Sequence, residues 1–208
     1  MNSAIDSDHD RVLSNTAFSG TYNMSLLPFC EWLASTPGSI ALHESLFMYP
    51  LVESTHVLTI CLFVGMSVIW DLRLLGVILP NVPMSDMDRK IWPFMLVGAI
   101  IMTITGFALF YAIPVRSYQN VFFRVKVIML IAAALNAWWF HRTVYSTVSE
   151  WGQARMRPPQ PARRAALASI CLWMLIVVAG RMIAYNWFDC DIGQGPFISW
   201  VAGCTPRT

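Results

Sequence analysis

The sequence predicts an all-α integral membrane protein, a four-helix bundle with an outer amphipathic N-terminal segment. Of its 208 residues, 56% are hydrophobic and 12% are charged, whereas a soluble domain uses about 25% charged residues to hydrate its surface. Four apolar stretches are each long enough to cross a bilayer as a helix. Because these spans and their connections occupy most of the chain, we predict one membrane domain and no separate catalytic domain.

The predicted membrane domain covers residues 26–191, between a polar, mobile tail at 1–25 and an outer C-terminal tail at 192–208. Residues 26–43 mix polar and apolar positions, which predicts an interfacial segment with a turn at Pro37 and Gly38. The predicted spans cover about residues 47–70, 91–113, 121–145 and 166–187. A polar turn of Asp71, Leu72 and Arg73 is expected to close the first of them.

Basic residues predict the orientation of the chain, because cytoplasmic loops are enriched in them. The end of the third span and the loop after it carry one acid, Glu150, and five arginines: Arg142, Arg155, Arg157, Arg163 and Arg164. This loop is therefore predicted to be cytoplasmic. Four spans then place both termini outside. There Cys190 and Cys204, with 13 residues between them, are expected to form a disulfide in an oxidising compartment.

Ionisable groups at membrane depth are costly and are candidates for function. The predicted outer side gathers five of them: Glu53, His56, Arg124, Lys126 and Arg181. In the functional interpretation, His56 binds a metal or haem iron, Glu53 orients it or carries protons, and the basic residues hold haem propionates. The structural alternative is an ion pair of Glu53 with Arg181, a hydrogen-bonded histidine, and two basic side chains that extend to lipid head groups.

A smaller set of polar residues belongs to the predicted inner side, namely Asp71, Arg73, Asn136, His141 and Arg142. At a rise of about 1.5 Å per residue, His56 and His141 differ in depth by about 16 Å, so they cannot bind one iron. His141 is therefore either a separate ligand or part of the interfacial aromatic belt. A haem at His56 would need His43, a methionine such as Met102 or Met182, or an open coordination position.

Several classes of function lack their usual sequence signals. The chain contains no Gly-rich phosphate loop, no HExxH and no GxSxG, and a net charge of +2 is too small to indicate nucleic acid. Without a CxxCH motif, covalently attached haem is not expected. Twelve methionines allow a copper interpretation, but they are scattered along the helices.

Four stretches of the sequence resemble a family of uncharacterised bacterial four-helix membrane proteins. They are YPLVESTHVL (49–58), DLRLLG (71–76), FFRVKV (122–127) and AGRMIAYNWFDC (179–190). More distantly, the chain resembles the copper-resistance D-like membrane proteins and small b-type cytochromes, whose bundles carry histidines at membrane depth. That resemblance implies metal or haem chemistry in a bacterial inner membrane, with His56 as the matching ligand. The chain departs from a di-haem pattern, because it has too few well-placed histidines for two bis-histidine sites.

The leading hypothesis from the sequence is a membrane electron-transfer subunit that binds b-type haem near the outer face through His56. Its expected partners are the lipid bilayer, other membrane or periplasmic redox subunits, and a quinone. A cofactor-free accessory subunit of a larger membrane complex is the alternative from a different class. Copper handling by His56 and the methionines is the third.

Overall fold

The computed structural model describes residues 26–185, 190, 195–202 and 204. Every regular element in these residues is a helix, and four of the helices are long and apolar enough to cross a membrane. The protein is therefore an all-α, multi-pass membrane helical bundle. The tail at 1–25 lies outside the described residues, as do residues 192–194, 203 and 205–208 of the C-terminal tail.

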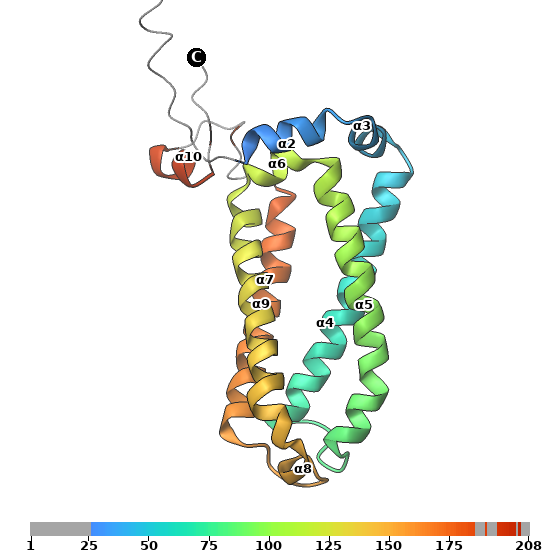
Figure 1. Cartoon of the computed structure of the whole chain (residues 1–208), viewed down its shortest axis with the longest axis vertical. Helices are drawn as coiled ribbons and strands as arrows, with labels where there is room; N and C mark the ends of the chain where they lie inside the picture. Colours follow the sequence, from blue (N-terminus) through green and yellow to red (C-terminus); the bar gives the residue numbers. More distant parts are fainter. Residues whose placement is uncertain (1–25, 186–189, 191–194, 203, 205–208) are drawn as a thin grey trace, which may run out of the picture.

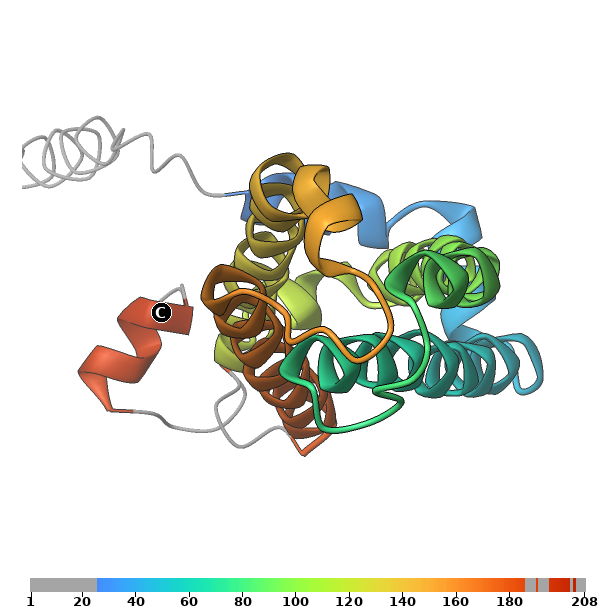
Figure 2. The ribbon, with the colours of Figure 1, turned by 90° about the horizontal axis from the view of Figure 1, so that it is seen from below.

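Four long helices form the bundle: α4 (Met48–Leu75), α5 (Met84–Ala112), α7 (Val121–Trp139) and α9 (Gln160–Ile183). Helix α4 packs against α5, α7 packs against α9, and α9 also contacts α4. Figure 2 shows α9 between α7 and α4 when the bundle is seen end-on. Alanines at the buried face of α9 keep these helix axes close, as small residues do in membrane bundles.

The ends of three spans differ from the sequence-based boundaries. The predicted polar turn at 71–73 is wrong, because α4 continues through it to Leu75. Asp71 and Arg73 are both buried there, and the Arg73 guanidinium donates two hydrogen bonds to the carbonyl oxygen of Val82. Gly76 ends the helix in the left-handed conformation, which a residue without Cβ adopts at little cost. Helices α5 and α9 begin before the apolar runs, at Met84 and Gln160, in turns that carry charged side chains.

Two short helices, α2 (Leu27–Ala34) and α3 (Pro37–Glu44), lie across one end of the bundle beside α6 (Pro114–Tyr118) (Figure 1). The expected turn at Pro37 and Gly38 is displaced, since Pro37 opens α3 and Thr36 caps it. Proline is favourable at the first helical position because its missing N–H needs no partner there. The Thr36 hydroxyl also bonds to the Tyr111 hydroxyl of α5 at 2.8 Å, which fastens the segment to the bundle.

The opposite end contains the best-packed core. After α7 the chain makes a π-helical turn (Phe140–Val144), a 3-10 turn (Tyr145–Thr147) and the short helix α8 (Val148–Trp151). A buried cluster joins these turns to the ends of three long helices: Leu74, Met84, Phe140, Val144, Trp151, Ala162, Ala165 and Ala166. Backbone hydrogen bonds fix the contact, since the carbonyl of Gly152 accepts from the Met84 N–H at 2.8 Å. The arginine-rich loop predicts that this end faces the cytoplasm.

The predicted orientation is testable with trypsin, because Arg155 and Arg157 are exposed in the loop before α9. In sealed right-side-out vesicles this loop should stay intact, since the basic loop is expected on the cytoplasmic side. Inside-out vesicles should be cut after Arg155, whereas the bond after Arg157 resists trypsin because Pro158 follows it. Cleavage of the loop in right-side-out vesicles, with an intact internal marker protein, would reverse the orientation.

Gly152 provides a test of the inner-end packing. A Cβ at this position would lie 2.5 Å from the Val148 carbonyl oxygen and 3.3 Å from the Met84 Cβ. We therefore expect Gly152→Ala to destabilise the bundle by about 1–3 kcal/mol through overpacking. Gly65→Ala is the matched control, because no atom lies within 4 Å of a Cβ there. Thermal aggregation in detergent should begin at a lower temperature for the first variant alone, and equal midpoints would contradict this account.

Candidate functional site

His56 lies in the half of the bundle next to α2 and α3, about 12 Å along α4 from its first residue. We call this half outer and the opposite half inner, after the orientation that the basic loop predicts. Its Nδ1 atom is 2.8 Å from the Thr105 hydroxyl oxygen of α5. The hydroxyl group in turn donates within its own helix, to the carbonyl oxygen of Ile101 at 2.7 Å. The backbone carbonyl of Met102 lies near the same hydroxyl and the same imidazole ring.

The contact with Thr105 suits one of the two neutral forms of His56. When the Thr105 hydroxyl donates to the backbone, its oxygen can accept a hydrogen bond from His56 Nδ1–H. A neutral His56 with its proton on Nδ1 has a lone pair on Nε2. Metal-bound histidines have this arrangement, with the distal nitrogen held by an acceptor and the other nitrogen free to coordinate.

Lys126 and two glycines complete the surroundings of His56. Lys126 of α7 is near enough for its charge to act on the imidazole. A Cβ on Gly106 would lie 3.3 Å from His56 Cε1, and a Cβ on Gly180 would lie 3.4 Å from Lys126 Nζ. The positions beside both polar side chains are therefore occupied by residues without side chains. We call His56, Thr105, Gly106, Lys126 and Gly180 the outer site.

The structure does not contain the ion pair between Glu53 and Arg181. In the described part of the chain, the single ion pair within 4.0 Å joins Asp86 to Arg89. Glu53 is exposed, and the Arg181 guanidinium lies over the Tyr185 ring at 5.2 Å. The ion pair that belongs to the structural alternative is therefore absent, whereas the hydrogen-bonded histidine of the same alternative is present.

Arg124 holds the C-terminal segment. Its Nη1 donates to the carbonyl oxygen of Val201 in α10 (Pro196–Ala202) at 2.7 Å, and its Nε donates to the Tyr118 carbonyl oxygen at 3.0 Å. The predicted pair Cys190 and Cys204 forms a disulfide next to this helix, with the two Cα atoms 5.4 Å apart. The Arg124 guanidinium thus donates to backbone oxygens. Lys126 is therefore the basic side chain that lies near His56.

The structure brings neither His43 nor His141 to His56. His43 lies in α3, where its ring contacts Tyr49 edge to face at 6.2 Å. His141 lies in the π-helical turn at the other end, among the rings of Trp92, Phe140 and Tyr145. No three His, Cys, Asp or Glu side chains gather into a metal-binding group anywhere in the described residues. A cofactor at His56 would therefore need to be one that takes a single protein ligand.

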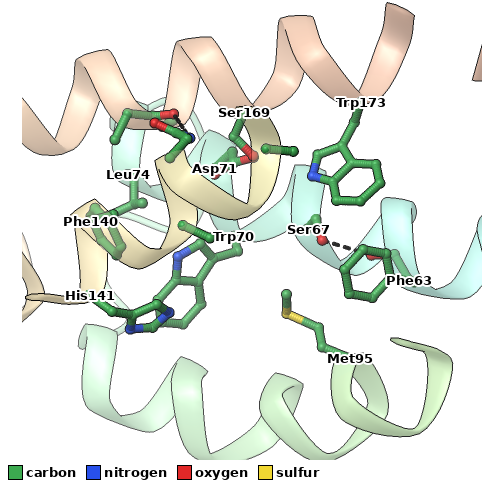
Figure 3. A pocket seen from close by; sticks show the side chains of 15 residues that line it. Phe63, Ser67, Trp70, Asp71, Leu74, Met95, Phe140, His141, Ser169 and Trp173 are labelled. Carbon is green, nitrogen blue, oxygen red and sulfur yellow. Dashed lines mark hydrogen bonds between the residues drawn. The ribbon is translucent and has the colours of Figure 1, made fainter. Parts of the chain in front are cut away.

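A second polar site lies in the inner half of the bundle, where a pocket of about 120 Å3 is enclosed by all four long helices (Figure 3). Aromatic rings form much of its wall: Phe63, Trp70, Phe140, His141 and Trp173. Polar groups are few. Asn136 donates to the Ala165 carbonyl oxygen at 3.0 Å, and Ser67 donates to the Phe63 carbonyl oxygen of its own helix at 2.9 Å.

Asp71 is the acidic side chain of this inner pocket. It is 5% exposed, and its Oδ2 atom has no hydrogen-bond partner in the structure. Ser169 of α9 lies beside the carboxylate (Figure 3), and no basic side chain of the described chain is within ion-pair distance. The sequence pattern predicts Asp71 in a closing turn. It does not indicate Ser169 or Trp173 as site residues, because both belong to an apolar span and only helix packing brings them to Asp71.

Comparison with known proteins gives one match. No curated protein and no solved structure matches the chain, and nothing in the comparison links it to copper-resistance D-like proteins or cytochromes. The matching family model covers residues 29–186, which includes both polar sites and all four spans. The chain therefore belongs to the family of unknown function DUF6644.

Proposed function

We propose that this protein is a membrane electron-transfer subunit that binds b-type haem near the outer face, with His56 Nε2 as the iron ligand. The observation that carries the proposal is the hydrogen bond from His56 Nδ1 to Thr105. This contact supports the tautomer with the proton on Nδ1, whose Nε2 lone pair would be available to the iron at membrane depth. Haem bound there would supply a one-electron carrier.

The other residues of the outer site have separate roles in this proposal. Lys126 has no carboxylate partner in the described chain, and a cation at this depth is stabilised by an anion beside it. A haem propionate is such an anion. Gly106 and Gly180 let His56 and Lys126 lie close to the backbones of α5 and α9, because a Cβ there would be 3.3 Å from His56 Cε1 and 3.4 Å from Lys126 Nζ. Thr105 keeps the imidazole in one orientation. A histidine without this hydrogen bond would adopt several orientations.

The positions of the other histidines limit which residues could hold the haem. Since His43 and His141 lie elsewhere, His56 would be the sole histidine ligand, and the alternatives for the second position are a methionine such as Met102 or Met182 or an open position. We propose the open position, and that electrons would pass to a quinone or a periplasmic redox protein at the outer face. The bacterial inner membrane is the proposed location, in keeping with the distant resemblance of the sequence to small b-type cytochromes.

A visible spectrum of the purified full-length protein tests the proposal. The wild type should contain about one haem per chain, and the reduced form should bind carbon monoxide because one axial position is open. His56→Ala should lower the haem content at least tenfold. His43→Ala and His141→Ala are matched controls that should retain it, since neither ring reaches His56.

Two results would overturn the haem assignment. One is a folded, monodisperse wild-type protein without haem, which would favour the cofactor-free accessory subunit. The other is a His56→Ala protein with unchanged haem content. Metal analysis of the same samples distinguishes copper handling, because copper in place of iron would support that alternative.

Gly106→Ala tests the orientation of the imidazole. The added methyl group would lie 3.3 Å from His56 Cε1, so the ring must turn and its hydrogen bond to Thr105 must weaken. We expect the haem content to fall several-fold while the fold is retained. Gly65→Ala, also in a spanning helix but with open space around the new Cβ, should leave haem content unchanged. Equal haem content in both variants would remove Thr105 from the proposed role.

A further inference from the structure

The inner pocket lies about 22 Å along α4 from His56 and is independent of the outer site. Its one acidic side chain is Asp71, and the rest of its wall is mainly aromatic and apolar, with Ser67, Asn136 and Ser169 as further polar side chains. Asp71 Oδ2 is buried without a hydrogen-bond partner. An ionised carboxylate in this position is unfavourable by several kcal/mol unless a cation joins it, so a cation in the pocket would stabilise the charged form of Asp71.

We propose that this pocket binds a small organic ammonium ion, with Asp71 as its counter-ion and Trp70 and Trp173 as aromatic walls. Trp173 makes an edge-to-face contact with Phe63 at 5.0 Å, which holds its ring in place. Aromatic faces attract cations, and tryptophan does so most strongly. Quaternary and primary ammonium groups are recognised in this way, by rings around the cation and one carboxylate near it.

The composition of the wall favours an organic ammonium ion over a metal ion. Sodium, magnesium and calcium require several oxygen ligands around them. Here Asp71 is the one carboxylate of the lining, and no group of three His, Cys, Asp or Glu side chains gathers in the described residues. A cavity of about 120 Å3 accepts a head group of a few heavy atoms, because a cavity of about 150 Å3 accepts benzene.

The pocket has an opening at the π-helical turn. Ala137 and His141 line it and are exposed, whereas Asp71 is buried on the opposite helix. Single π-helical turns inside longer helices occur frequently at functional sites. Here the turn begins at Phe140 and places both the Phe140 and His141 rings at the pocket. A ligand enters past His141 and meets the carboxylate at the closed end.

Binding exchanges a proton for the ammonium ion, because the carboxylic acid must lose its proton to become the counter-ion. The proton leaves to solvent and no covalent bond to the ligand forms. Charged or titratable groups also belong to the elements around Asp71. Among them are Arg73 of α4, bonded to Val82, Asp88 of α5, bonded to Tyr145, His141 and Arg142 of the π-turn, and Arg163 and Arg164 of α9. Because Asp71 must be ionised to act as the counter-ion, binding is expected to become stronger as pH rises.

Calorimetric titration of the full-length protein in maltoside detergent, which contains no ammonium group, tests this proposal. Tetramethylammonium, choline and ethanolammonium are the probes, each at constant ionic strength. At least one should bind with a stoichiometry of one, more tightly at pH 8 than at pH 5.5 and with release of a proton. The neutral choline isostere 3,3-dimethylbutan-1-ol should bind at least tenfold more weakly than choline. Phosphatidylethanolamine added in the same detergent should compete if lipid head groups enter the pocket, and should have no effect if only free amines do.

Matched variants locate the binding. Asp71→Asn should weaken it at least tenfold and abolish proton release, whereas Asp86→Asn removes the same charge from an exposed inner-side position and should have no effect. Trp173→Leu should weaken binding several-fold, and Trp138→Leu, at an exposed position of α7, should not. The proposal is overturned if no probe binds to folded wild type, if the neutral isostere binds as tightly as choline, or if Asp71→Asn binds like wild type.

Discussion

Hydrocarbon offers no hydrogen-bond partner, and the structure depends on this constraint throughout. The backbone satisfies itself in helices. Hydroxyl side chains in the spans do the same, since those of Thr55, Thr59, Ser67 and Thr103 donate to a carbonyl oxygen one turn earlier. Polar groups that cannot be satisfied within one helix then determine how the helices face one another. Against this background, the buried, unpartnered oxygen of Asp71 is conspicuous because it has no structural use.

The two ends of the bundle are built differently, and each construction suits the site beside it. At the outer end, the short helices α2, α3 and α6 lie across the bundle and are held by hydroxyl contacts to Tyr111. At the inner end, apolar side chains and close backbone contacts form a compact core. That core encloses the inner pocket and keeps its aromatic walls rigid. The outer site depends on a single hydrogen bond between α4 and α5, so its geometry is more sensitive to small substitutions.

The proposed chemistries of the two sites are separated along the membrane normal. In the outer site, His56 and Lys126 combine a coordinating nitrogen with a cation, which suits an anionic iron porphyrin. In the inner pocket, Asp71 combines a carboxylate with aromatic rings, which suits a cation. Opposite charges at the two depths mean that one ligand would not bind well at both. The haem proposal and the ammonium proposal are therefore independent, so a result that contradicts one does not contradict the other.

The sequence by itself determined that the chain is an all-α protein with four spans, because an apolar run of bilayer length has one stable conformation in lipid. It also pointed to His56 and to the cysteine pair that the structure joins. It did not determine which residues face each other. Apolar side chains surround every span, so the hydropathy pattern marks no inward face. Only helix packing decided that Thr105 holds His56, that Glu53 and Arg181 stay apart, and that Asp71 meets Ser169 inside a pocket.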